Sequence, residues 1–142
     1  MKIVVCGSMS SYLKMGEIKK YLTSAGHTVY LPDPEDDEHV QNIINQCYID
    51  THQIKIKYDY IRKHYNQIVR GDCLLVANYD KAEVKNYIGG HTFLEMGFAY
   101  VLGKPIYLLN PIPKISFYYH EMVAMEPVIL RGDISRIPKS IQ

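Results

Sequence analysis

One acidic residue stands out because of the turn that precedes it. Glu95 comes three residues after Thr92, which ends the run Gly89-Gly90-His91-Thr92. Thr92 is a suitable helix cap, so Glu95 is expected in the first turn of a helix. A carboxylate can stabilise an oxocarbenium-like sugar centre or form an ester with it. The same spacing fits a capping box, in which Glu95 reaches back to the Thr92 N–H. At this point Glu95 is either a catalytic carboxylate or a helix-capping residue.

A second turn has the residue types of a phosphate site. Gly7, Ser8 and Met9 follow an apolar run and precede a helical pattern that contains Tyr12. Backbone N–H groups and the helix dipole at such a turn favour a phosphate. The sequence has neither a GxGxxG fingerprint nor a GxxxxGK[ST] loop. These four residues are candidate substrate contacts, and an ordinary serine-capped turn is the alternative.

The elements that position these turns alternate between strand and helix. Apolar runs predict strands over residues 2–6, 27–31, 73–77, 105–109 and 128–130. Helical patterns are expected from Ser10 or Ser11 to Gly26 and over residues 40–48, 58–69, 92–102 and 118–124. This alternation predicts an α/β fold, a doubly wound parallel sheet of about five strands in a three-layer sandwich, with residues 1–142 as a single domain.

Ligands of such folds bind at the carboxyl ends of the strands. The loop that follows the third predicted strand runs from Asn78 to Thr92. Its candidate substrate-binding residues are Asn78, Gly89, Gly90, His91 and Thr92.

The helix predicted over residues 58–69 carries a histidine of uncertain role. Its apolar stripe is expected to comprise Tyr58, Ile61, Tyr65, Ile68 and Val69. His64 lies beside Arg62 and Lys63, which favours a surface position, with a titrating acid as the alternative.

Composition excludes several classes of protein. Sixteen Lys and Arg against fifteen Asp and Glu give a net charge of +1, which argues against binding long nucleic acids. No apolar run approaches the length of a membrane span, so a cytoplasmic protein is expected. The three cysteines have neither disulfide nor zinc-site spacing, and the acidic segment 33–38 lacks EF-hand spacing. We therefore expect no metal site and no cofactor.

In combination, these motifs resemble the nucleoside 2-deoxyribosyltransferase superfamily, including its nucleoside 5′-monophosphate N-glycosidase branch. The resemblance rests on Cys6-Gly7-Ser8, Gly71-Asp72, Gly90 with Thr92, Glu95-Met96-Gly97-Phe98-Ala99 and Gly103-Lys104-Pro105. It implies a flavodoxin-like fold, a small nucleoside or nucleotide as substrate, and a homodimer or higher homo-oligomer. It also implies that Glu95 is the nucleophile and that Gly7-Ser8 holds a 5′ hydroxyl or phosphate.

The chain departs from the pattern at the residues that assist this glutamate. Val4 stands where the transferases have a tyrosine, His64 where they have an aspartate, and Gly89 where they have an aspartate and the hydrolases a serine. His64 and Asp72 are the candidate helpers that remain, although Asp72 also suits a structural loop role.

Two functions from different classes follow. The first is cleavage or transfer at the N-glycosidic bond of a nucleoside or nucleoside 5′-monophosphate, through Glu95 and a glycosyl-enzyme intermediate. The second is a non-catalytic nucleotide-binding module of the same fold. An FMN carrier fits less well, because no Ser/Thr-rich phosphate loop follows the first strand.

Overall fold

The computed structural model describes residues 1–32 and 51–141. The helix predicted over residues 40–48, the acidic loop at 33–38 and Cys47 lie outside the described residues.

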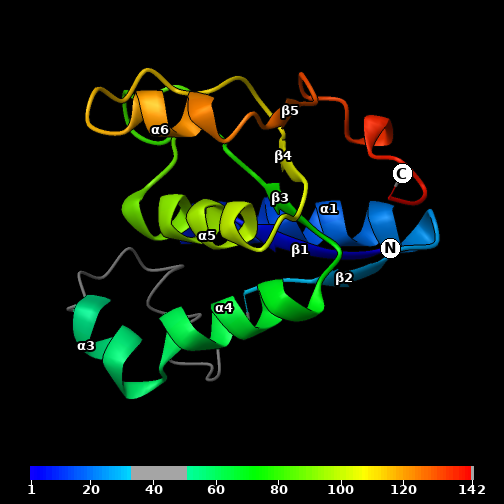
Figure 1. Ribbon diagram of the computed structural model, residues 1–142, viewed down its shortest axis with the longest axis horizontal. Helices are drawn as coiled ribbons and strands as arrows, with labels where there is room; N and C mark the ends of the chain where they lie inside the picture. Colours follow the sequence, from blue (N-terminus) through cyan, green and yellow to red (C-terminus); the bar gives the residue numbers. More distant parts are fainter. Residues whose placement is uncertain (33–50, 142) are drawn as a thin grey trace.

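The core of the fold is one parallel sheet (Figure 1). Its strands are β1 (Lys2–Cys6), β2 (Thr28–Tyr30), β3 (Cys73–Val76), β4 (Ile106–Leu108) and β5 (Val128–Ile129), in the order β2-β1-β3-β4-β5. Every adjacent pair is parallel; Val4, for example, lies opposite Leu74, which in turn lies opposite Ile106. The structure therefore confirms the flavodoxin-like, doubly wound α/β fold.

The helices occupy nearly the positions that the sequence predicts. They are η1 (Met9–Ser11), α1 (Tyr12–Ser24), α3 (Thr51–Lys57), α4 (Tyr60–Arg70), α5 (Gly90–Val101), α6 (Tyr119–Ala124) and η2 (Ile134–Arg136). Most ends agree within two residues, whereas α3 was not predicted. Gly26 and Gly103 have positive φ angles just after α1 and α5, as expected of glycines that end helices.

Alternate side chains of each strand pack on opposite faces of the sheet. Ile3 and Val5 of β1 pack with α1 in one apolar cluster. Val4 and Cys6 pack with α4, α5 and α6 in the other. The sheet is therefore covered on both faces, which gives the predicted three layers (Figure 1).

Several expected core positions are exposed. Ile61, Tyr65 and Val69 of α4 are 43%, 37% and 44% exposed. The predicted stripe was therefore wrong at these positions. The physical reason is that the sheet covers only one narrow stripe of each helix, so further apolar residues on that helix stay in solvent.

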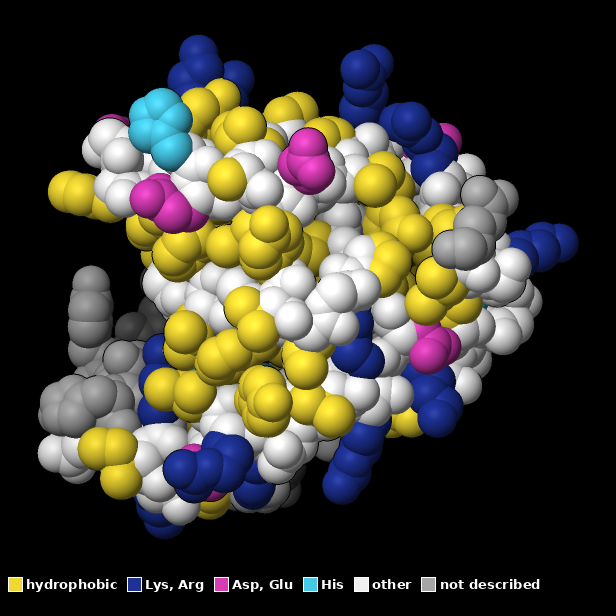
Figure 2. Space-filling model, viewed as in Figure 1, with side chains coloured by type: hydrophobic (Ala, Val, Ile, Leu, Met, Phe, Trp, Pro, Cys, Tyr) yellow, Lys and Arg dark blue, Asp and Glu magenta, His cyan; other side chains and the backbone are white. Residues whose placement is uncertain are grey.

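These exposed side chains belong to an apolar surface on α4 and α5. It includes Ile61, Tyr65, Val69, Leu94, Tyr100 and Val101. Figure 2 shows apolar side chains gathered on the face that carries these helices. The predicted homo-oligomer stays a prediction, and light scattering coupled to gel filtration would test it by giving a mass of two or more chains.

Lys104 lies between α5 and β4 and binds the end of α4. Its ammonium group donates to the carbonyl oxygens of Val69 and Gly71, at the carboxyl end of α4. These carbonyl groups have no partner within the helix, so the lysine satisfies them and complements the helix dipole. Lys104 therefore anchors α4 and has a structural role.

In residues 1–32 and 51–141, no helix is both long enough and apolar enough to cross a membrane.

Candidate active site

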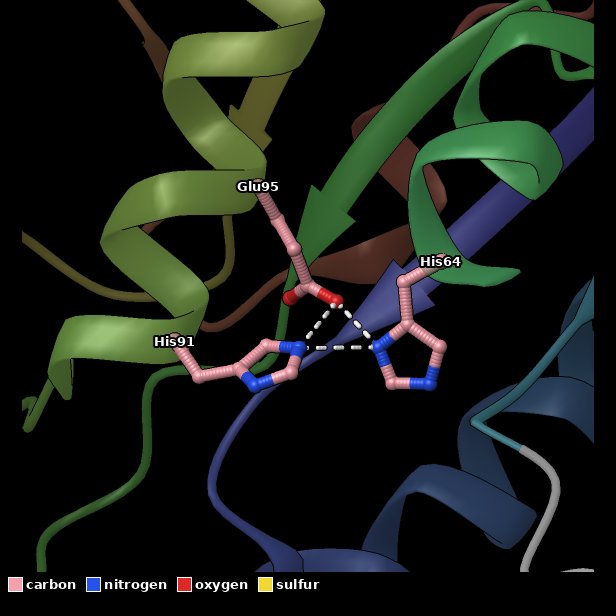
Figure 3. A group of neighbouring side chains, drawn as sticks. All are labelled: His64, His91 and Glu95. Atoms are coloured by element: carbon pink, nitrogen blue, oxygen red, sulfur yellow. Dashed lines mark hydrogen bonds and ion pairs between the residues drawn. The ribbon is translucent and has the colours of Figure 1, made fainter. Parts of the chain in front are cut away.

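Three titratable side chains from two helices meet beside the carboxyl ends of β1 and β3 (Figure 3). His64 comes from α4, and His91 and Glu95 come from α5. The Nδ1 atom of His64 lies 2.6 Å from Glu95 Oε1 and 3.1 Å from His91 Nε2. His91 Nε2 lies 3.5 Å from the same carboxylate oxygen. Because β1 and β3 are the strands at which the order of the sheet reverses, the cluster occupies the usual ligand edge of this fold.

His64 faces inward, so its interpretation as a surface residue was wrong. Tyr60, His64 and Ile68 follow one another at four-residue spacing, and Tyr60 and Ile68 are buried. The side chain of His64 is 14% exposed, and its ring stacks on Tyr60 at a centroid distance of 5.9 Å. Ring packing on one side and the Glu95 carboxylate on the other therefore hold the imidazole.

The capping box suggested by the spacing of Thr92 and Glu95 does not form. α5 begins at Gly90 with Gly89 as its N-cap, so Thr92 lies inside the first turn and is buried. Glu95 turns away from the helix start toward His64 on the neighbouring helix. Gly89 has the extended conformation that is usual for an N-cap residue.

The Glu95 carboxylate is buried but remains in its charged form. Burial by itself raises the pKa of Glu95, and the hydrogen bonds and positive charge of His64 and His91 more than offset it, so the pKa is lowered. Cys6 lies against the same carboxylate at the end of β1. Burial, the negative charge of Glu95 and a hydrogen bond to it raise the pKa of the Cys6 thiol well above its usual value. Cys6 is therefore a protonated, buried neighbour and not a nucleophile.

The turn after β1 approaches the loop after β3 closely. A Cβ on Gly7 would lie 2.9 Å from the carbonyl oxygen of Ala77, so only glycine fits without movement. Ser8 and Ser10 share a hydrogen bond of 2.9 Å between their hydroxyl groups, and Met9 opens η1. Ser11 occupies the N-cap position of α1 without a side-chain cap bond.

Replacing Gly7 with alanine should destabilise the protein by about 1–3 kcal/mol, since the new methyl group meets rigid backbone. Urea unfolding monitored by circular dichroism would show a lower midpoint with an unchanged slope. Gly16→Ala is the matched control, because Gly16 lies inside α1 with open space around it and should gain about 0.5–1 kcal/mol. Equal effects of the two substitutions would contradict the close approach at Gly7.

Asn78 holds two loops together and is not available to a ligand. Its side chain is fully buried; its Nδ2 donates to the carbonyl oxygens of Asn110 and Pro111, and its Oδ1 accepts from the Asn110 N–H. Asn110 Nδ2 in turn donates to the Asn78 carbonyl oxygen. The predicted substrate contact is corrected to a structural link between the loops that follow β3 and β4.

The other candidates lie in two different places. Gly90 is exposed at the start of α5, with open space where a Cβ would be, and Tyr12 is partly buried at the start of α1. Asp72, by contrast, lies at the amino end of β3, where its carboxylate accepts from the Lys2 N–H at 2.6 Å. In a parallel sheet this is the edge opposite the site, so Asp72 is not a helper residue.

Sequence reasoning missed the convergence of His64, His91 and Glu95. A usable signal exists, because His91 and Glu95 are four residues apart on α5 and therefore share a face. The spacing of Tyr60, His64 and Ile68 likewise marks the buried stripe of α4. The packing of α4 on α5, with Tyr65 edge-on to Phe98 at 5.2 Å, brings the two faces together.

Comparison with known proteins gave matches among solved structures only. No family model matches the sequence, and no curated protein matches it. The chain is similar to a 2-deoxyribosyltransferase from Bacillus psychrosaccharolyticus, with 20% identity over 76% of this chain and 71% of that one, at a TM-score of 0.49. It is also similar to the CMP N-glycosidase BcmB of Clostridium botulinum, with 11% identity over 91% of this chain and 85% of that one, at a TM-score of 0.49.

Proposed function

We propose that this protein cleaves or transfers the N-glycosidic bond of a nucleoside or nucleoside 5′-monophosphate, with Glu95 as nucleophile. The observation that carries the proposal is a buried carboxylate at the ligand edge of the sheet, hydrogen-bonded by His64, which lowers its pKa. The sequence resemblance set out above supports the same chemistry.

The reaction has two steps. An oxygen of Glu95 attacks C1′ of the sugar and forms an ester, while the C1′–N bond breaks and the base leaves with the electron pair and takes a proton from solvent. Water then attacks C1′, loses a proton and regenerates the carboxylate. If a second base replaces water, the same intermediate gives transfer in place of hydrolysis.

The two histidines have different parts in this reaction. His64, whose ring stacks on Tyr60, lies 2.6 Å from Oε1 and orients the carboxylate. The side chain of Glu95 is 5% exposed, and His91, which is 21% exposed, lies 3.5 Å from Oε1. We therefore propose that His91 moves aside when a sugar binds. The turn at Gly7-Ser8, on the adjoining strand end, would bind the 5′ hydroxyl or phosphate.

The test is to incubate the purified protein with a panel of ribo- and deoxyribonucleosides and their 5′-monophosphates. Chromatography should show a free base, and intact-protein mass spectrometry of a rapidly quenched reaction should show one added sugar or sugar phosphate. Peptide mapping should place the adduct on the segment that contains Glu95. A binding module, by contrast, would be stabilised thermally by a nucleotide and form no product in a long incubation.

A further inference from the structure

The cluster His64, His91 and Glu95 also has the composition of a metal site. Two imidazole nitrogens and one carboxylate oxygen, partly shielded from solvent, converge on one point. His91 and Glu95 are one helical turn apart on α5, and His64 joins them from α4. We infer that these three side chains bind a divalent transition-metal ion, with Zn²⁺ as the representative ion.

The distances agree with this assignment. Zinc lies about 2.0–2.1 Å from nitrogen and oxygen ligands, which puts two ligand atoms of a tetrahedral site about 3.3 Å apart. The His64 Nδ1 to His91 Nε2 distance is 3.1 Å and the His91 Nε2 to Glu95 Oε1 distance is 3.5 Å. Only the 2.6 Å contact between His64 Nδ1 and Glu95 Oε1 must lengthen. A small shift of either side chain is therefore enough to admit the ion.

The three facing atoms can all act as ligands of one cation. His64 Nδ1 and His91 Nε2 face each other and the same carboxylate oxygen. When each imidazole is neutral and carries its hydrogen on the other ring nitrogen, His64 Nδ1 and His91 Nε2 both direct a lone pair at the point that the carboxylate oxygen also faces. A single divalent ion accepts a lone pair from each of the three atoms. Two imidazoles and a carboxylate suit zinc-class ions and not Mg²⁺, which prefers oxygen ligands.

An ion bound here would regulate the proposed reaction, and this part of the inference rests on the proposed function. Coordination occupies Glu95 Oε1 and holds His91 in front of the carboxylate, so the ion and the sugar compete for the same group. Metal binding should therefore inhibit base release, and a chelator should restore it. The expectation from the sequence that no metal is bound stays a prediction, and the binding experiment decides between it and this inference.

The binding experiment uses the full chain after treatment with a chelator and its removal. Titration with Zn²⁺ alone, followed by calorimetry, should show one equivalent bound, and Co²⁺ should give the visible absorption of a low-symmetry nitrogen and oxygen site. Mg²⁺ should show neither effect. His91→Gln, at the more exposed ligand, and His64→Gln should each weaken Zn²⁺ binding by more than tenfold.

Two histidine variants serve as controls. His120→Gln changes an exposed histidine on α6 and should leave Zn²⁺ affinity unchanged. His27→Gln removes an imidazole that lies 3.3 Å from the amino-terminal nitrogen, outside the cluster, and should also leave Zn²⁺ affinity unchanged. Loss of binding in His27→Gln, with normal binding in folded His91→Gln, would overturn the assignment, and so would the lack of any bound Zn²⁺ in the unaltered chain.

The activity measurement separates this inference from the proposed function. Base release by the chelator-treated protein and its inhibition by Zn²⁺ would support both. Zn²⁺ binding by a protein that releases no base in either state would support the metal site and contradict the glycosidic activity. Base release without any Zn²⁺ binding would support the glycosidic activity and contradict the metal site. If base release required Zn²⁺, the ion site would be confirmed. The proposed inhibition and the role of Glu95 as nucleophile would both be contradicted.

Discussion

Replacing Glu95 with glutamine should lower kcat/KM for base release at least about a thousandfold, because an amide oxygen cannot form the glycosyl ester. Glutamine has the same shape and can still accept a hydrogen bond from His64, so the fold should be retained. The rate would be measured by chromatography of the released base in the presence of a chelator. Intact mass spectrometry of the variant should show no sugar adduct.

Glu121→Gln is the matched control for this substitution. Glu121 is exposed on α6, so its loss removes the same charge from the chain without touching the site. Its rate should stay within about twofold of that of the unaltered protein, since substitutions of exposed residues away from the site and the core have small effects. If Glu95→Gln kept the full rate, another group would be the nucleophile and the proposed mechanism would be wrong.

Replacing Asn78 with alanine should destabilise the protein by about 2–4 kcal/mol and lower its melting temperature by about 10 °C. The substitution removes three hydrogen bonds in a fully buried position and leaves the Asn110 N–H without its acceptor. Thermal unfolding followed by circular dichroism measures the change. The loss should appear in stability, because the side chain links two loops and does not face a ligand.

Asn66→Ala makes the same chemical change on the exposed face of α4. It should alter stability by no more than about 0.5 kcal/mol, since alanine is a better helix former than asparagine. A similar melting temperature for the two variants would contradict the structural role of Asn78. If Asn78→Ala had a normal melting temperature and bound a nucleotide more weakly, Asn78 would be a substrate contact after all.

The order and type of most elements could be predicted from the sequence, because local signals are strong there. Residues 73–76 are continuously apolar, which suits a central parallel strand buried on both faces, and this strand lies in the middle of the sheet. Gly26 and Gly103 mark helix ends because their positive φ angles are unfavourable for other residues. These features depend on neighbours along the chain, so sequence patterns report them well.

The face that each helix turns toward the sheet could not be predicted as well. α4 has one broad apolar side, and the stripe expected from hydrophobicity omitted His64. Only the packing of α4 against β1 and α5 selects the stripe of Tyr60, His64 and Ile68, because the sheet has room for one stripe. The same packing turns Glu95 from a cap of its own helix into a partner of His64.

The residues themselves specify a glutamate on a helix that starts at the ligand edge, and the sequence places it there without help from the structure. The charge of that glutamate depends on its contacts with two histidines. His64 is 31 residues away along the chain, and His91 is four residues away. The first of these contacts exists only when two helices from separate crossovers pack side by side. Local spacing carries no information about such a distance, so the tertiary structure alone determines the environment in which Glu95 acts.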